Sequence, residues 1–178
     1  VATPPRSPFK GLSAFEDTDL DALFFFGRER ETEVIVANLL ASNLTVLYGP
    51  SGVGKSSILR AAVAKRLREL APGAEVVILD EWATDPQLPD PFDEAFLILD
   101  QFEEYFLYHE HDGPLHERLP ALLANPHVHV LVAVREDALA RLDAFQARIP
   151  NVFANRLRLD QLDVIAGRAA VVRPLDRW

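Results

Sequence analysis

The 178-residue chain contains neither cysteine nor methionine, and its basic residues are fewer than its acidic ones, 18 against 27. The lack of cysteine excludes disulfides and thiolate metal sites, and it fits a cytoplasmic location. No apolar run approaches the roughly 20 residues that a membrane-spanning helix needs, and no signal-peptide pattern opens the chain. The net charge of −9 argues against a general nucleic-acid-binding surface. We therefore expect no membrane partner and no nucleic-acid partner for this chain.

The composition is otherwise that of an ordinary globular domain, with 49% hydrophobic and 25% charged residues. A chain of this length can bury a sizeable core within one domain. Because the chain begins with Val1 and lacks methionine, we interpret it as a piece of a longer polypeptide.

Residues 49–56 read GPSGVGKS, a phosphate-binding loop of the form G-x-x-x-x-G-K-S. The apolar run 44–48 before it predicts a buried strand, and the periodicity of residues 57–70 after it predicts a helix. In such a loop the backbone N–H groups point into one concavity, at the positive end of the following helix. The expected nucleotide-binding residues are Gly49, Pro50, Ser51, Gly52, Val53, Gly54, Lys55, Ser56 and Ser57. Among them, the lysine would reach the β- and γ-phosphates and the hydroxyl of Ser56 would ligate Mg²⁺, whereas a chance Gly-rich turn is the alternative.

The remaining pattern alternates short apolar runs with helical periodicity. Strands are predicted at residues 75–79, 96–99, 128–134 and 157–159, and helices at 29–41, 103–109, 115–123, 137–149 and 162–172. The first of these helices has Val34, Ala37 and Leu40 near one face, and the last is expected to end before Pro174. Prolines make the start of the chain an extended arm, which the apolar run 24–26 seats on the domain. The alternation predicts an α/β fold with a mainly parallel sheet.

Charged side chains follow two of the predicted strands, where parallel sheets collect their ligands. The run FLILD ends on Asp100, which would hold Mg²⁺, through water because that ion dehydrates reluctantly. Either Glu103 or Glu104 would orient and polarise the attacking water in hydrolysis of a γ-phosphate. The alternative for both glutamates is a solvated, acidic helix start.

Two arginines are further candidates for contact with the nucleotide. Arg135 ends the fourth strand, where a guanidinium would read the γ-phosphate or stabilise charge in the transition state. A pair with Asp137 or another nearby carboxylate is the alternative for this residue. Arg28 follows Gly27 and is a candidate for the nucleotide or its base pocket.

Five segments in order resemble the novel STAND NTPase domain, and together they cover nearly the whole chain. They are PFKGLSAFEDTDLDALFFFGRERE, YGPSGVGKSSILRA, FLILDQFEEYF, LVAVREDALARL and NVFANRLRLDQLD with RPLDR. STAND proteins are multidomain signal-transduction ATPases related to AAA+ proteins and to the NACHT and NB-ARC switches. The resemblance implies a three-layer P-loop NTPase of the ASCE class, with helices on both faces of a five-stranded sheet and the fourth strand between the first and the third.

The resemblance also implies roles for individual residues. Gly27 and Arg28 would form an adenine-side G-R box, Lys55 and Ser56 Walker A, Asp100 Walker B, Glu103 and Glu104 the acidic pair after it, and Arg135 a sensor arginine. The cofactors would be ATP or ADP with Mg²⁺, in a slow Mg-dependent ATPase that works as a switch. Its partners would be effector and sensor domains of the same longer polypeptide and, on activation, further copies of the chain, in signalling or bacterial defence. The rival functions are a nucleotide-dependent scaffold without hydrolysis and a AAA+-like motor or loader acting on DNA.

We divide the chain into an N-terminal arm with the G-R box, residues 1–28, and a P-loop NTPase core, residues 29–178. Two features depart from the family. Three prolines within residues 82–95 prevent the expected helix between the second and third strands, so we hypothesise that residues are missing near 87–92. The helical lid and winged helix would begin near Arg173-Pro174, so we expect both regions to be absent and hydrolysis by this piece to be slow. The sequence does not discriminate ATP from GTP.

Overall fold

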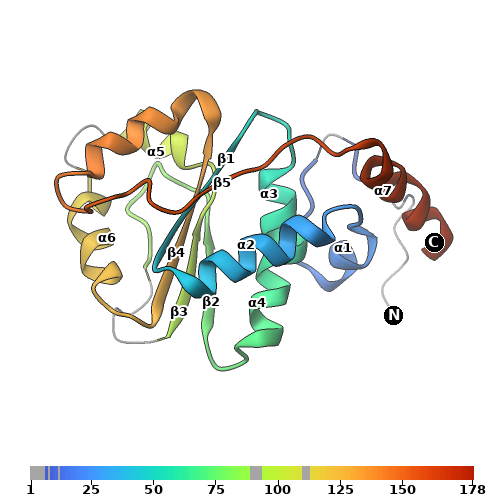
Figure 1. The fold of residues 1–178 in the computed structure, drawn as a ribbon, viewed down its shortest axis with the longest axis horizontal. Coiled ribbons are helices and arrows are strands. Elements are labelled where there is room, and N and C mark those ends of the chain that lie inside the picture. Colours follow the sequence, from blue (N-terminus) through green and yellow to red (C-terminus); the bar gives the residue numbers. More distant parts are fainter. Residues whose placement is uncertain (1–6, 8, 12, 89–93, 110–112) are drawn as a thin grey trace.

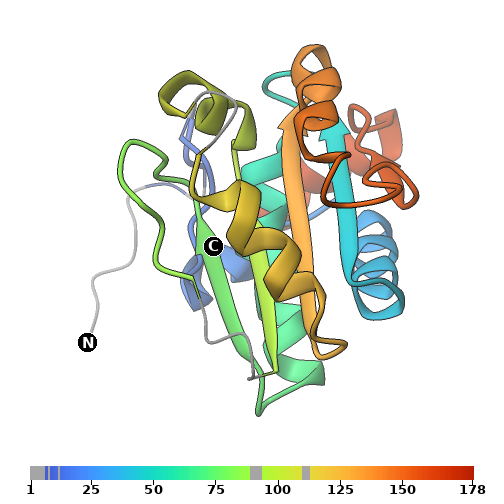
Figure 2. The ribbon, with the colours of Figure 1, turned by 90° about the vertical axis from the view of Figure 1, so that its left-hand side faces the viewer.

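The computed structural model describes residues 7, 9–11, 13–88, 94–109 and 113–178. A five-stranded sheet forms from β1 (Leu44–Gly49), β2 (Glu75–Leu79), β3 (Ala95–Leu99), β4 (Val128–Arg135) and β5 (Arg156–Arg158). Its order is β2-β3-β4-β1-β5 and every neighbouring pair is parallel. Figure 2 shows this succession from the green β2 to the cyan β1. The fourth strand therefore lies between the first and the third, as expected.

Helices cover both faces of the sheet, which makes three layers (Figure 1). One face carries α2 (Glu29–Ala41) and a continuous helix built from α3 (Lys55–Ile58), the π-helical turn η1 (Leu59–Val63) and α4 (Ala64–Leu70). The other carries η2 (Phe102–Glu104), α5 (Tyr105–Tyr108), α6 (Leu115–Leu123) and η3 (Glu136–Phe145). Two further helices, α1 (Asp19–Phe24) and α7 (Val164–Arg177), pack against each other at one end of the molecule. None of the helices that the structure describes is long and apolar enough to cross a bilayer.

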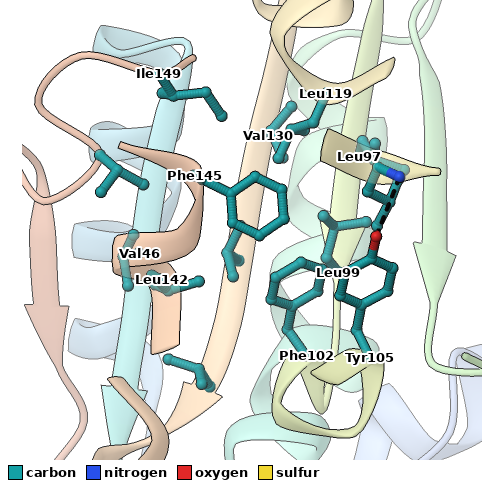
Figure 3. Packing of buried hydrophobic residues seen from close by; sticks show 14 of the residues in the cluster. Val46, Leu97, Leu99, Phe102, Tyr105, Leu119, Val130, Leu142, Phe145 and Ile149 are labelled. Atoms are coloured by element: carbon teal, nitrogen blue, oxygen red, sulfur yellow. Dashed lines mark hydrogen bonds between the residues drawn. The ribbon is translucent and has the colours of Figure 1, made fainter. Parts of the chain in front are cut away.

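The core consists of two apolar layers, one on each side of the sheet. Along β4, Val130 and Val132 face the layer under α6 and η3, whereas Leu131 and Ala133 face α2 and α4. Every residue of β3 is buried, as expected for a parallel strand covered on both faces. Figure 3 shows the first layer, in which the Tyr105 hydroxyl accepts a hydrogen bond from the Leu115 N–H at 3.2 Å.

The sequence correctly predicted the bounds of α2, but the apolar face that it identified is not the one that enters the core. Val34 and Leu40 are 44% and 45% exposed, and Ala37 is exposed as well. The side chains that enter the core are Thr32, Ile35, Val36 and Leu39. Because α2 has apolar residues on more than one side, its periodicity fits two faces, and packing against the sheet selects between them.

Other segments also differ from their expected form. The predicted helix over residues 137–149 is instead the 3₁₀ segment η3 followed by turns. The last helix continues through Pro174, because its final turn is held by a hydrogen bond from Arg177 to the Leu23 carbonyl and by packing of Trp178 on Phe24. The arm includes an unpredicted helix, α1, whose first turn is capped by the Thr18 hydroxyl.

The connection from β2 to β3 contains no helix in its described part, residues 80–88 and 94. The hypothesis of missing residues near 87–92 concerns a stretch that lies largely outside the described residues. Trp82 anchors the start of this connection, because its indole is buried and Nε1 donates a hydrogen bond to the Asp100 carbonyl at 3.0 Å. That contact fixes the end of β2 beside the end of β3.

Candidate functional site

The phosphate-binding loop joins β1 to the continuous helix that begins with α3. Gly54 immediately precedes this helix with φ of +95°, a left-handed conformation that a residue with a side chain rarely adopts. Its carbonyl accepts the first helical bond, from the Ile58 N–H at 3.0 Å. The loop thus turns directly into a helix N-terminus, the geometry that binds phosphate.

Lys55 is held at this loop by two backbone carbonyls. Its ammonium Nζ donates to the Gly49 oxygen at 2.9 Å and to the Pro50 oxygen at 3.0 Å. Burial lowers the pKa of Lys55 from its ordinary value, although the carboxylates of Glu103 and Asp100 oppose that shift. The amine is therefore partly desolvated and surrounded by the residues that the sequence placed in the site.

Ser56 and Asp100 meet at the carboxyl ends of β1 and β3. The serine hydroxyl donates to Asp100 Oδ1 at 3.1 Å, and the Gln101 N–H donates to the same oxygen at 2.9 Å. The carboxylate is fully buried, and its Oδ2 has no hydrogen-bond partner among the described residues, only Arg60 Nη2 at 3.6 Å. A buried oxygen left without a hydrogen bond, next to a hydroxyl, supplies the hard oxygen ligands that Mg²⁺ prefers. These two residues therefore fit the expected metal.

We expect Asp100→Asn to stabilise the protein in the absence of metal by about 1–3 kcal/mol, because the amide has the size of the carboxylate but no charge that folding has to bury. For a domain of this size, each kcal/mol corresponds to roughly 2–4 °C in Tm. Urea denaturation with EDTA measures the change, and Asp143→Asn, at an exposed carboxylate, serves as the control. A loss of stability in Asp100→Asn would contradict the expectation.

The same variant should have a characteristic pH dependence. Burial raises the pKa of Asp100 above its ordinary value of 3.8, so the folded state binds its proton more tightly than the unfolded state does. Below that ordinary value the carboxyl is protonated in both states and carries no charge penalty. As pH rises through the raised pKa, folding has to bury a charge. The advantage of Asp100→Asn should therefore grow from about pH 4 towards neutrality in the same denaturation series.

A cavity of about 810 Å³ connects the phosphate-binding loop with Arg28, Glu103 and Arg135, whereas the buried Asp100 does not line it. Glu103 lines it, and its Oε2 accepts a hydrogen bond from the Arg135 backbone N–H at 3.1 Å. Glu104 does not line it, although the two glutamates are neighbours in η2. The two were equivalent in the sequence, and the turn of η2 separates them.

Arg135 also lines the cavity, but its guanidinium is paired with Asp137. The distances are 3.1 Å from Nε to Oδ1 and 2.5 Å from Nη2 to Oδ2. This is the pairing that the alternative interpretation of the residue predicted. An exposed pair of this kind is weak, so the guanidinium remains available to an anion in the cavity.

Arg28 is 5% exposed and is hydrogen-bonded to the phosphate-binding loop. Its Nη2 donates to the Val53 carbonyl at 2.9 Å, and its Nη1 pairs with Glu31 at 2.8 Å. The residue lines the cavity as well, so it joins the G-R segment to the phosphate-binding loop. The neighbouring Gly27 has φ of +86°, and a Cβ there would collide with the Ala166 carbonyl oxygen of α7.

Aromatic residues of the N-terminal arm form another wall of the cavity. Phe24, Phe25 and Phe26 line it together with Phe15, which packs edge-on against Phe25 at 5.2 Å between ring centroids. Leu162 and Ala170 border it from the region of α7. The apolar run that was expected to seat the arm therefore also shapes the cavity.

Sequence reasoning missed Arg60, which lies beside the metal-binding candidates. Its guanidinium contacts Asp80, Asp100 and Glu16. The sequence did contain an indication that Arg60 lies near the site. Arg60 follows Ser56 by four residues, and residues at that spacing share one face of a helix. Its acidic partners come from distant parts of the chain, which no local pattern connects.

The sheet order, the loop and the cavity define this chain as an α/β P-loop NTPase domain. Similar folds occur in the Saccharomyces cerevisiae Hsp104–ADP complex (TM-score 0.58, covering 85% of this chain and 24% of that one) and in Aeropyrum pernix ORC2 with ADPNP and ADP (0.55, 88% and 51%). A Walker-type ATPase of Pyrococcus abyssi has a TM-score of 0.54, covering 93% and 60%. Each of the three is 16% identical to this chain, so these likenesses concern the fold alone.

The family model described as Novel STAND NTPase 1 matches residues 8–87, less than half of the chain, and confirms the resemblance seen in the sequence over that part. Among curated proteins, the phosphate import ATP-binding protein PstB of Tropheryma whipplei is 41% identical over 71 residues, covering 38% of this chain and 26% of PstB. The ribosome biogenesis GTPase RsgA of Clostridium botulinum is 37% identical over 54 residues, covering 30% and 18%. This chain thus spans about a quarter or less of the length of these relatives.

Proposed function

We propose that this chain is the nucleotide switch domain of a STAND-type signalling or bacterial defence protein, and that it binds ATP and hydrolyses it slowly. One observation carries the proposal: a single cavity is lined by Lys55, Ser56, Glu103 and Arg135, and Asp100 lies directly behind Ser56. Phosphate binding needs the lysine, metal binding the serine and aspartate, and water activation a carboxylate. All three requirements meet at the carboxyl edge of the sheet, where open α/β sheets bind their ligands.

In the proposed reaction, the loop N–H groups and Lys55 hold the phosphates. Ser56 and Asp100 would hold Mg²⁺, which neutralises the charge on the β- and γ-phosphates when it is bound. Glu103 would orient the attacking water and accept its proton, since it lies in the same cavity as the lysine. The Arg135 guanidinium would leave Asp137 and contact the transferred phosphoryl group. There it would stabilise the negative charge that develops in the transition state.

We place the nucleoside against the aromatic wall of the arm, with Arg28 supporting the loop at its side. Phe15, Phe24 and Phe26 line the cavity there, and a purine would pack against this aromatic wall. We propose ATP as the nucleotide because the segments quoted above resemble those of STAND ATPases; the family model itself is described only as an NTPase. The division into an arm, residues 1–28, and a core, residues 29–178, forms part of this proposal.

In the whole protein, bound ATP would favour one arrangement of the domains, and hydrolysis or exchange would favour another. This change would be transmitted to effector and sensor domains of the same polypeptide and to further copies of the chain. We place the protein in the cytoplasm. The family match supports this role. A ligand shifts such an equilibrium only if it binds the two states with different affinity. The contacts between the nucleotide and the cavity residues must therefore differ between the two arrangements.

The first test is binding and turnover of ATP by the wild-type chain, with Mg²⁺ and with EDTA. We expect ATP to bind more tightly with Mg²⁺, and phosphate release to be slow and metal-dependent. Binding without metal-dependent release would contradict the hydrolysis and favour the scaffold function. The same assay with GTP checks the base, and failure of both nucleotides to bind would overturn the proposal. Salt-dependent binding of DNA would favour the motor function, against which the net charge of −9 argues.

A further inference from the structure

The N-terminal arm is attached along the helix that follows the phosphate-binding loop. The Phe15 N–H donates to the Ser57 hydroxyl at 3.3 Å, Glu16 pairs with Arg60 at 3.0 Å, and Asp17 receives both terminal nitrogens of Arg68, at 2.7 and 2.6 Å. Three consecutive arm residues thus contact three positions of one helix. Figure 1 shows the blue arm segment beside α3 and α4.

Of the three helix residues that contact the arm, Arg60 also lies at the candidate metal site. Its Nη1 binds Glu16 from the arm, and its Nη2 binds Asp80 at the end of β2. The same Nη2 lies 3.6 Å from Asp100 Oδ2 at the end of β3. The Arg60 side chain is 16% exposed, and its Nε is buried without a hydrogen-bond partner among the described residues. The guanidinium is therefore shared among three carboxylates and does not satisfy all of them.

The charged groups around Arg60 have an excess of negative charge, which a divalent cation would balance. Three carboxylates surround one guanidinium, which leaves two negative charges without a partner within this group. Asp100 has the buried free oxygen, whereas Glu16 is 52% exposed and can be hydrated. A cation at Asp100 would therefore compete with Arg60 for this aspartate and would not compete directly for Glu16.

We propose that Arg60 is a positioning residue that couples docking of the N-terminal arm to metal and nucleotide binding. The inference rests on the proposed function of the site. When Asp100 holds a metal, Arg60 is left to Asp80 and Glu16, and its bond to the arm is strengthened. By thermodynamic reciprocity, Glu16 draws Arg60 away from Asp100 and so favours metal binding.

The coupling matters because the arm forms part of the nucleotide cavity. Gly11, Ser13, Ala14 and Phe15 line the cavity beside the phosphate-binding loop. An arm held tightly by Arg60 keeps this wall in place, whereas a released arm opens it. Binding of metal and nucleotide and docking of the arm therefore stabilise each other. The position of the arm then depends on whether the site is occupied.

A double-mutant cycle tests the proposal, with Glu16→Gln, Arg60→Gln and the double variant. The measurement is the Mg²⁺ affinity of the complex with a fluorescent ADP analogue. We expect Glu16→Gln to weaken Mg²⁺ binding about fivefold or more, the lower range of typical couplings, and Arg60→Gln to strengthen it. The double variant should behave as Arg60→Gln alone does. Arg66→Gln is the matched control, because Arg66 lies on the same helix but pairs with Glu33 and Glu69.

Hydrogen exchange of residues 13–20 provides a second measurement that does not depend on activity. In the wild type, Mg²⁺ with ADP should slow exchange in this segment relative to ADP with EDTA, and Arg60→Gln should remove that difference. An undiminished effect of Glu16→Gln in the Arg60→Gln background, or exchange insensitive to the metal, would overturn the inference. If the wild type still binds nucleotide through Lys55, such a result leaves the proposed function standing; if it does not, both proposals fall. Should Arg60→Gln not fold, the exposed Glu16→Gln alone still decides, since unchanged Mg²⁺ affinity contradicts the coupling.

Discussion

Lys55→Ala should lower the affinity for ATP at least about 100-fold while leaving the fold intact. A charge-assisted hydrogen bond contributes about 1.5–3 kcal/mol, and the lysine would reach two phosphates, so a loss of about 3 kcal/mol or more is expected. Each 1.4 kcal/mol corresponds to about tenfold in affinity. Stability should fall by no more than about 1–3 kcal/mol, because the substitution removes the donor to the carbonyls of the buried Gly49 and the half-buried Pro50 but also removes a partly desolvated ammonium.

Isothermal titration with ATP and Mg²⁺ measures this loss. Lys65→Ala is the matched control, since Lys65 lies further along the same helix and does not line the nucleotide cavity. Comparable affinities for Lys55→Ala and the wild type would show that the loop does not bind phosphate in this chain.

Glu103→Gln should slow ATP hydrolysis by about 100-fold or more, because general-base catalysis contributes typically 10²–10⁴-fold. The amide keeps the size of the side chain and can still accept the Arg135 N–H hydrogen bond, but it cannot take a proton from water. Affinity for ATP should therefore stay close to that of the wild type. The effect is confined to turnover, which separates a catalytic role from a binding role.

Glu104→Gln is the matched control for this variant, because Glu104 is the neighbour of Glu103 in η2 and lies outside the cavity. Its turnover should equal that of the wild type in single-turnover phosphate release. If the control lost turnover and Glu103→Gln kept it, the assignment of the base from the cavity would be wrong. Equal turnover in all three proteins would show that neither glutamate is the catalytic base.

The sequence predicted those elements best whose pattern is local. The bounds of α2, β2 and α6 agree with the expected ranges because their apolar runs and the turn residues that flank them are contained in short segments. The patterns failed where distant packing decides. The buried face of α2 and the continuation of α7 through Pro174 both depend on which element lies opposite.

The sequence by itself determined that residues 49–56 form a loop of the phosphate-binding pattern at the end of a buried strand, and that Asp100 directly follows another strand. Such features depend on backbone conformation and hydrophobic pattern, which neighbouring residues encode. Only the tertiary structure decided that Glu103 faces the cavity and that Arg60 is shared among Glu16, Asp80 and Asp100. The physical reason is that these contacts join positions that are 20 to 44 residues apart. Their partners are set by the order of the strands and the docking of the arm, which no local pattern encodes.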